Sequence, residues 1–322
     1  MEDRPVGHQT QFNSVATPRR LAQQWPMSQM HKGQVETSPD MVTQLLAGQF
    51  PEWLRPEITL VKSFGTDHDI YRVGDDVCVR LPKIEWATAQ AEKEGRWLPQ
   101  LANRLPVRVP RQLGIGAPAG SYPFRWSVCE WIPGSDASRV RVDLERLAED
   151  LAAFVTALSN IATTGAPLRP AGARGCPLSE VDDAVRRSIA SLGNDWALDG
   201  ITQLWTESLG AAVWDGEEVW IHGDLLAGNL IVQERQLYAV IDWGTLNVGD
   251  PACDLLAAWN VFSGSSRAAY LEALSVDDGS WLRGRGWAIY QAVMALPYYR
   301  DTNPGMVRQA THALEEVIAD SR

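Results

Sequence analysis

The sequence predicts an α+β protein of two lobes, a small antiparallel β-sheet carrying one helix and a larger, mostly helical lobe. Three observations lead to this fold class. Short β-like runs separated by turns dominate the chain up to Ile132, and amphipathic helical periodicity dominates it afterwards. The turn dipeptide Pro133-Gly134 marks the change between the two patterns. A chain of 322 residues is long enough to bury a sizeable core.

The first lobe begins with a helix, because Ser38-Pro39-Asp40 is typical of a capped helix N-terminus. A second helix is expected over residues 87–103, where apolar residues recur at helical spacing. The stretch from Gly114 to Gly120 is expected to be a loop, since it lacks the βαβ context of a dinucleotide-binding fingerprint. The expected strands are residues 58–62, 69–73, 77–81, 107–109 and 124–132.

The second lobe shows helical periodicity along most of its length. Two short strands, residues 230–233 and 237–241, are the expected exception. The expected helices are residues 142–159, 180–192, 199–212, 252–261, 268–274, 286–296 and 305–320. Residues 165–175 are a Gly- and Pro-rich stretch of low complexity.

Composition narrows the classes of function. The net charge is −11, and residues 133–322 hold 26 acidic residues against 14 arginines and no lysine, a net charge of −12. Such a surface disfavours nucleic acid and suits a cationic small molecule, although a solvated acidic face explains it equally well. No apolar run approaches the length of a membrane span. Four scattered cysteines without a CxxC pair indicate reduced thiols of a cytoplasmic protein. A monomer and a homodimer are both compatible with the sequence.

A polar loop early in the second lobe carries the pattern of a phosphoryl-transfer site. The loop begins with His222-Gly223-Asp224, and Asn229 follows five residues after Asp224. Ile241-Asp242-Trp243 ends the next apolar run. In protein kinases this layout places one aspartate at the hydroxyl to be phosphorylated, and an asparagine and a second aspartate on Mg²⁺. We therefore expect a protein-kinase-like fold, with Asp224 catalytic and Asn229 and Asp242 as metal ligands.

The neighbours of this loop are interpreted as structural. His222 is expected to brace the loop rather than to act as the base. Asp250 and Asp254 are expected to accept hydrogen bonds from loop backbone and to cap the next helix. On this interpretation residues 1–37 are a flexible N-terminal extension, 38–132 form a nucleotide-binding lobe, and 133–322 form a helical lobe with the catalytic loop and the acceptor site.

A kinase also needs a cation on the nucleotide phosphates and a carboxylate that holds it. Arg80, at the end of a predicted strand, and Glu94, on the following helix, are the expected pair. Lys83 and Glu92 remain alternatives for the two roles. Arginine stays charged and can contact phosphate through two N–H groups, but it is bulkier than lysine.

Two further segments are expected to contact the nucleotide. The turn of residues 63–68, with Gly65 and Thr66, would cover the phosphates. The strand that leads out of the first lobe would bind the purine through the Glu130 carbonyl and the Ile132 N–H. Cys129 is small, which permits ATP.

Taken together, these residues resemble the aminoglycoside phosphotransferase family, which includes macrolide and other antibiotic kinases. The resemblance spans residues 42–320 and rests on six segments. They are Val79-Arg80-Leu81-Pro82-Lys83, Glu94 with Trp97-Leu98-Pro99, Trp131-Ile132-Pro133-Gly134, His222-Gly223-Asp224 with Asn229, Ile241-Asp242-Trp243, and Gly249-Asp250-Pro251 with Asp254. It implies Mg²⁺-dependent transfer of the γ-phosphate of ATP or GTP to a hydroxyl of a small molecule, and an acceptor pocket formed by a helical insert and the C-terminal helices. Arg80 departs from the family's more familiar lysine.

The acceptor itself stays open at this stage. An aminoglycoside or related antibiotic is the leading interpretation, a sugar or amino alcohol of metabolism is the alternative, and a non-catalytic nucleotide-binding protein is the third. Carboxylates that could clamp a cationic acceptor are Asp195, Asp199, Asp277 and Asp278. Aromatic residues that could wall an apolar pocket, but are mostly expected in the core, are Trp196, Trp205, Trp259, Trp281, Tyr298 and Tyr299.

Overall fold

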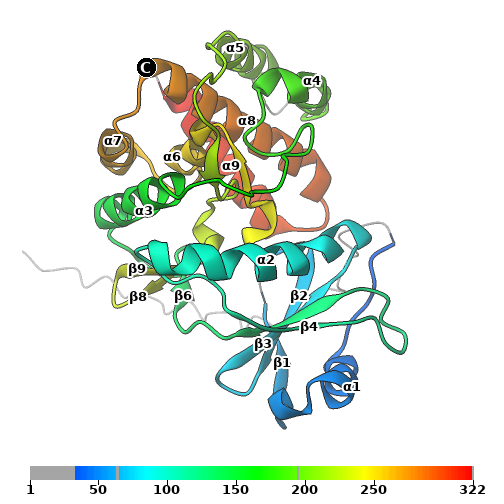
Figure 1. Cartoon of the computed structure of the whole chain (residues 1–322). Helices are drawn as coiled ribbons and strands as arrows, with labels where there is room; N and C mark the ends of the chain where they lie inside the picture. Colours follow the sequence, from blue (N-terminus) through cyan, green and yellow to red (C-terminus); the bar gives the residue numbers. More distant parts are fainter. Residues whose placement is uncertain (1–32, 63–64, 194–195, 321–322) are drawn as a thin grey trace, which may run out of the picture.

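The computed structural model describes residues 33–62, 65–193 and 196–320. It has the predicted architecture, a small β-rich lobe below a larger helical lobe (Figure 1). The first lobe holds a five-stranded antiparallel sheet in the order β1-β2-β3-β5-β4. Its strands are β1 Ile58–Leu60, β2 His68–Val73, β3 Val77–Pro82, β4 Gln112–Gly116 and β5 Trp126–Glu130.

Two helices accompany this sheet. Helix α1 Pro39–Gln49 starts as predicted, with the Ser38 hydroxyl accepting a hydrogen bond from the Met41 N–H at 3.2 Å. Its apolar residues share a core with the sheet, in which Phe50 meets Trp126 edge to face. Helix α2 Thr88–Leu101 lies between the sheet and the second lobe (Figure 1). Trp97, on α2, joins the core of the second lobe, and its ring centroid lies 5.1 Å from that of Trp220.

Two expectations for the first lobe were wrong. Residues 107–109 form no strand of this sheet, because Pro106 and Pro110 flank them and proline cannot donate to a β-ladder. Arg108 instead pairs in parallel with Ala239 of the second lobe. The expected loop at Gly114 is in fact part of β4, and its end at Gly116 lets the Trp126 ring approach so closely that a Cβ would lie 2.0 Å from it.

Residues just before α1 also contact the sheet. The Val35 N–H donates to the Lys83 carbonyl at 2.9 Å, and the Thr37 hydroxyl donates to Asp69 at 2.6 Å. The last residues of the expected extension therefore pack on the first lobe. Residues 1–32 of that extension lie outside the described residues.

The second lobe is helical around two small sheets. Its helices are α3 Leu144–Ser159, α4 Asp182–Ala190, α5 Leu198–Leu209, α6 Ala257–Asn260, α7 Gly264–Ala273, α8 Asp278–Tyr299 and α9 Pro304–Ala319. Its strands are β6 Ser135–Asp136, β7 Val219–Ile221, β8 Leu230–Gln233, β9 Gln236–Val240 and β10 Asn247–Gly249. The sheet β6-β8-β9 and the antiparallel pair β7-β10 are both present. Strands β6, β7 and β10 were not predicted, because runs of two or three residues carry no readable alternation.

Helix α8 is longer than predicted and passes through the middle of the lobe. Gly284 and Gly286 lie in its first half, where a Cβ would come within 2.6 Å of Leu255 and 2.5 Å of Leu178. The first half of the expected helix over residues 252–261 belongs to a 3₁₀ stretch, Pro251–Leu256, which is followed by the short α6. No helix among the described residues is long and apolar enough to cross a membrane.

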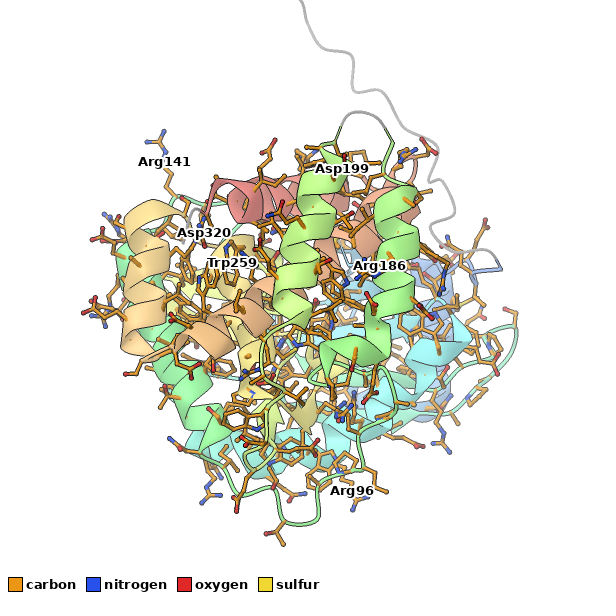
Figure 2. The ribbon with its side chains drawn as sticks, turned by 90° about the horizontal axis from the view of Figure 1, so that it is seen from above. Arg96, Arg141, Arg186, Asp199, Trp259 and Asp320 are labelled. Carbon is orange, nitrogen blue, oxygen red and sulfur yellow. The ribbon has the colours of Figure 1, made fainter. Side chains whose placement is uncertain are left out.

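Three of the six aromatic residues left open by the sequence belong to the buried core. Trp205, Trp259 and Trp281 are buried, and Figure 2 places Trp259 inside the lobe. Tyr298, by contrast, is 52% exposed at the end of α8. Asp199 lies on α5, in the layer farthest from the first lobe (Figure 2). Asp195 lies outside the described residues.

Candidate active site

The predicted catalytic loop follows β7, and the buried carboxylate of Asp254 holds its backbone in place. Asp254 accepts hydrogen bonds from the N–H groups of His222 at 2.8 Å and Gly223 at 2.7 Å. Gly223 has φ +78°, and a Cβ there would lie 3.0 Å from Arg174. Asp250 caps the next turn through the Ala252 N–H at 2.9 Å. The structural roles expected for Asp250 and Asp254 are confirmed.

His222 is buried between the loop that carries Asp224 and the segment that carries Asp242. Its Nδ1 accepts a hydrogen bond from the Asp224 N–H at 3.2 Å, and its Nε2 lies 3.1 Å from the Ile241 carbonyl oxygen. Since a carbonyl only accepts, Nε2 must carry the proton and the ring is neutral. Burial lowers the pKa of His222 to about 4, in agreement with this tautomer. His222 therefore braces the loop, as predicted.

Asp224 is surrounded by three donors. Asn229 Nδ2 donates to its backbone carbonyl at 2.8 Å and to Oδ2 at 3.2 Å. Gln291 Nε2, from α8, donates to Oδ1, and Arg174 Nη2 lies 3.9 Å from the same oxygen. Burial raises the pKa of Asp224 to about 7. Arg174 opposes this rise, and the Asp242 carboxylate adds to it.

Asp242 follows β9 and faces the same space. Its backbone is left-handed, with φ 63° and ψ 69°, an uncommon conformation for a residue other than glycine. Its Oδ1 lies 4.0 Å from Arg80 Nη2, and its side chain is 44% exposed. The preceding Ile241 N–H donates to the Asn229 carbonyl at 2.9 Å. The structure therefore brings Asp224, Asn229 and Asp242 together, as the sequence predicted.

These residues fit Mg²⁺, which usually binds one or two protein carboxylates together with substrate phosphates. Asp242 offers a partly exposed carboxylate. Asn229 uses Nδ2 on Asp224, which leaves Oδ1 available as a metal ligand. Among the described residues, no group of three or more His, Cys, Asp or Glu side chains could hold a metal by itself. Nucleotide phosphates would therefore have to complete the coordination.

The four side chains considered for the nucleotide phosphates form different ion pairs. Arg80 forms a buried ion pair with Glu94. Burial alone would lower the pKa of Arg80, but the Glu94 carboxylate more than offsets this and the pKa lies above its ordinary value. Lys83 instead pairs with Asp69 at 3.4 Å. Glu92 pairs at the surface, with Arg125 at 3.1 Å.

The other residues expected to contact the nucleotide also lie where the two lobes meet. Gly65 is exposed, and the Thr66 hydroxyl donates to Asp67 at 2.7 Å and shares a hydrogen bond with Tyr299 of α8. Ser63 and Phe64 of this turn lie outside the described residues. Thr66 therefore connects the described part of this turn to α8 of the second lobe.

The expected purine segment lies at the end of β5. The Glu130 side chain is bound by Arg108 and Arg111, so only its backbone could contact a purine, as expected. Ile132 follows two residues after the end of β5. Cys129 is buried directly opposite Cys78 of β3.

Three contributors to the site were missed. Lys93 donates to the Leu246 carbonyl at 3.2 Å and to that of Gly244, which ties α2 to the segment after Asp242. Arg174 comes from the Gly- and Pro-rich stretch. Gln291 is a buried amide on an apolar helix, which is the one local signal that could have revealed it.

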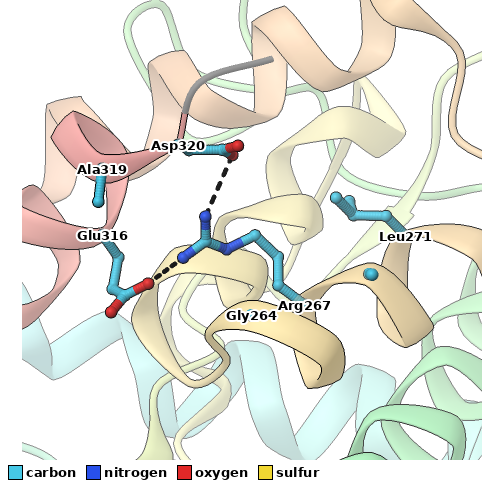
Figure 3. A pocket seen from close by; sticks show the side chains of 7 residues that line it. Gly264, Arg267, Leu271, Glu316, Ala319 and Asp320 are labelled. Atoms are coloured by element: carbon cyan, nitrogen blue, oxygen red, sulfur yellow. Dashed lines mark hydrogen bonds and ion pairs between the residues drawn. The ribbon is translucent and has the colours of Figure 1, made fainter.

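A cavity of about 290 Å³ between α7 and α9 is separate from this site (Figure 3). Its charged side chains already pair with one another. Arg267 binds Glu316 and lies 3.3 Å from Asp320. We assign it no function.

Comparison with known proteins gives a consistent result. The model of the phosphotransferase enzyme family matches residues 61–293. An aminoglycoside 2″-phosphotransferase solved with GDP and kanamycin has 20% identity and a TM-score of 0.69, covering 87% of this chain and 99% of that one. A macrolide 2′-phosphotransferase of type I has 21% identity and a TM-score of 0.61, covering 87% and 98%. One from Brachybacterium faecium has 24% identity and a TM-score of 0.56, covering 85% and 98%. The three similarities to solved structures, all below 25% identity, show the fold alone. No curated protein sequence matches the chain.

Proposed function

Because the chain belongs to the phosphotransferase enzyme family, we propose that it moves the γ-phosphate of ATP or GTP to a hydroxyl of an aminoglycoside or related antibiotic. The observation that carries this proposal is the meeting of Asp224, Asn229 and Asp242 opposite the buried Arg80–Glu94 pair. Such an enzyme would confer resistance to the drug. The four cysteines, all free and buried, support a cytoplasmic location.

In this mechanism each group has one task. Asp224 accepts the proton of the acceptor hydroxyl and directs its oxygen at the γ-phosphorus. Arg80, held in place by Glu94, contacts the nucleotide phosphates. Asn229 and Asp242 would hold Mg²⁺, which would supply positive charge to the transferred group. Nucleotide would lie on residues 38–132 and acceptor on residues 133–322.

One observation favours the second candidate, a kinase of a neutral metabolite such as a sugar. Asp277 caps α8 through the Ser280 N–H at 2.8 Å. Gln291, which touches Asp224, lies fourteen residues further along, about 20 Å away at the rise of an α-helix. Asp277 and Asp278 are therefore poorly placed to clamp a cation beside the reacting hydroxyl, and Arg174 is positively charged there.

A panel assay tests the proposal. Purified full-length protein is incubated with Mg²⁺, ATP or GTP, and kanamycin, erythromycin, amino sugars or neutral sugars, and phosphate transfer is followed by mass spectrometry. Transfer to a drug supports the antibiotic kinase, and transfer to sugars alone supports the second candidate. Nucleotide binding without transfer to any acceptor would contradict both and favour a binding protein.

The assignment of the base is tested by Asp224→Ala. We expect a loss of turnover of about a hundredfold or more, with unfolding temperature within a few degrees of the wild type. Asp75→Ala, which removes a fully exposed aspartate, is the matched control and should keep full activity. Wild-type turnover in Asp224→Ala would refute the role of this carboxylate.

A further inference from the structure

The carboxylate of Asp224 is fixed by a side chain from a distant helix. Gln291, on α8, donates from Nε2 to Asp224 Oδ1. Its other amide atom, Oε1, accepts from Asn260 Nδ2 at 2.5 Å. Asn260 ends α6, and its carbonyl accepts from Gln309 of α9 at 2.7 Å. These contacts form a continuous chain of hydrogen bonds from α9 to the catalytic loop.

The orientation of the Gln291 amide is determined by its neighbours. A carboxylate accepts only, so the N–H side of the amide must face Asp224. The Asn260 N–H then meets the carbonyl side, and a flipped amide would create repulsion at both ends. This chain of hydrogen bonds therefore presents a donor, and not an acceptor, to Asp224 Oδ1.

Packing alone does not account for this pair of amides. Gln291 and Asn260 are 8% and 3% exposed, and the Gln291 neighbours Ile289, Ala292 and Val293 on α8 are buried apolar residues. Burying two amides costs free energy unless their hydrogen bonds are made, and an apolar pair would avoid that cost. The two buried amides are explained if their hydrogen bonds serve to hold the Asp224 carboxylate in one plane.

We propose that Gln291, oriented by Asn260, is a positioning residue for phosphoryl transfer. It holds Asp224 Oδ1 while Asn229 holds Oδ2, so the carboxylate plane is fixed against rotation. This inference rests on the proposed role of Asp224 as the base.

Two variants with opposite chemistry test it. Gln291→Met keeps the length of the side chain and removes the donor. We expect kcat to fall at least tenfold, KM for ATP to stay within twofold, and the acidic limb of the kcat–pH profile to move to higher pH. Gln203→Met, on the exposed face of α5, is the matched control and should leave all three unchanged.

Gln291→Glu gives a different signature. A protonated glutamic acid can still donate to Asp224, whereas an ionised one repels it. We expect activity close to the wild type at neutral pH and a loss above neutral pH, where the wild type stays active. Activity retained at neutral pH would show that a protonated donor at position 291 suffices, and loss of activity at every pH would contradict the positioning role.

The assay uses Mg²⁺, ATP and either kanamycin, erythromycin or galactose, with slow ATP hydrolysis as a second readout in which water is the acceptor. If the wild type transfers phosphate but Gln291→Met keeps its kcat and its acidic limb, the positioning role is refuted and the proposed function stands. If neither transfer nor hydrolysis occurs in the wild type, the proposed function fails and this inference fails with it.

Discussion

Replacing Arg174 with methionine removes the positive charge beside Asp224 while keeping most of the side-chain volume. Arg174 Nη2 lies 3.9 Å from Asp224 Oδ1, and the two side chains are only 16% and 21% exposed. The guanidinium also stacks on Tyr290, 4.7 Å from the ring centroid, so methionine can occupy the same apolar surface. The substitution therefore changes mainly the electrostatic environment of the carboxylate.

The size of the effect follows from this geometry. At an effective dielectric constant of about 20, unit charges 4 Å apart interact by roughly 4 kcal/mol, which is an upper bound for this pair. Carboxylates beside an arginine commonly have a pKa lowered by about 1 to 3 units. With the pKa of Asp224 at about 7, loss of Arg174 should raise it further. The ionised fraction at pH 7 would then fall about fivefold for the first added unit and about tenfold for each further unit.

The assay is the pH dependence of kcat with saturating nucleotide and acceptor. The base must be ionised, so activity is lost as the pH falls through the pKa of Asp224. We expect Arg174→Met to move this acidic limb upward by at least one unit and to recover activity at high pH. Arg169→Met, from the same stretch but paired with Glu218, should leave the limb in place. An unmoved limb in Arg174→Met would refute the electrostatic argument.

Three further predictions concern stability and the nucleotide. Because burial raises the pKa of Asp224, ionisation of this carboxylate destabilises the folded protein as the pH rises from about 4 through 7. The unfolding temperature of Asp224→Asn should therefore exceed that of the wild type by more at pH 8 than at pH 5. An equal difference at both pH values would contradict this. Glu94→Ala leaves Arg80 buried without its carboxylate, and we expect a loss of about 3 to 5 kcal/mol in urea unfolding and a KM for ATP raised at least tenfold, whereas Glu92→Ala on the same helix should change neither. Asp254→Ala leaves two buried catalytic-loop amides without an acceptor, and should cost about 3 kcal/mol or more in urea unfolding, a prediction that wild-type stability would overturn.

Much of the fold could be predicted because its signals are local. Strands β2 and β3 begin and end within one residue of the predicted bounds, since alternation and a hairpin turn lie in the same short window. The cap of α1 is equally local. The prediction of helix α8 began only at Gly286, because glycine disfavours a helix in isolation and Gly284 lies just before it. Only the neighbouring Leu255 and Leu178, distant in sequence, show why glycine is needed at those positions.

The site divides along the same line. Asp224 and Asn229 lie on one loop and bond to each other, so their spacing alone revealed them. Arg80 was the expected partner of Glu94, but Lys83 stayed an alternative, because which of the two side chains pairs with Glu94 depends on which one faces α2 once the sheet has formed.

The residues that hold Asp224 from outside its loop are the part that sequence reasoning lost. Arg174 precedes Asp224 by 50 positions in the chain, and Gln291 follows it by 67. No local pattern demands either residue, because an arginine in a glycine-rich stretch and a glutamine on an apolar helix each fold equally well without Asp224. Their common meeting point at Oδ1 exists only after α8 and the stretch before α4 have packed against the catalytic loop. In the proposed mechanism the loop would supply the reacting carboxylate, and Arg174 and Gln291 would supply its charge environment and its orientation.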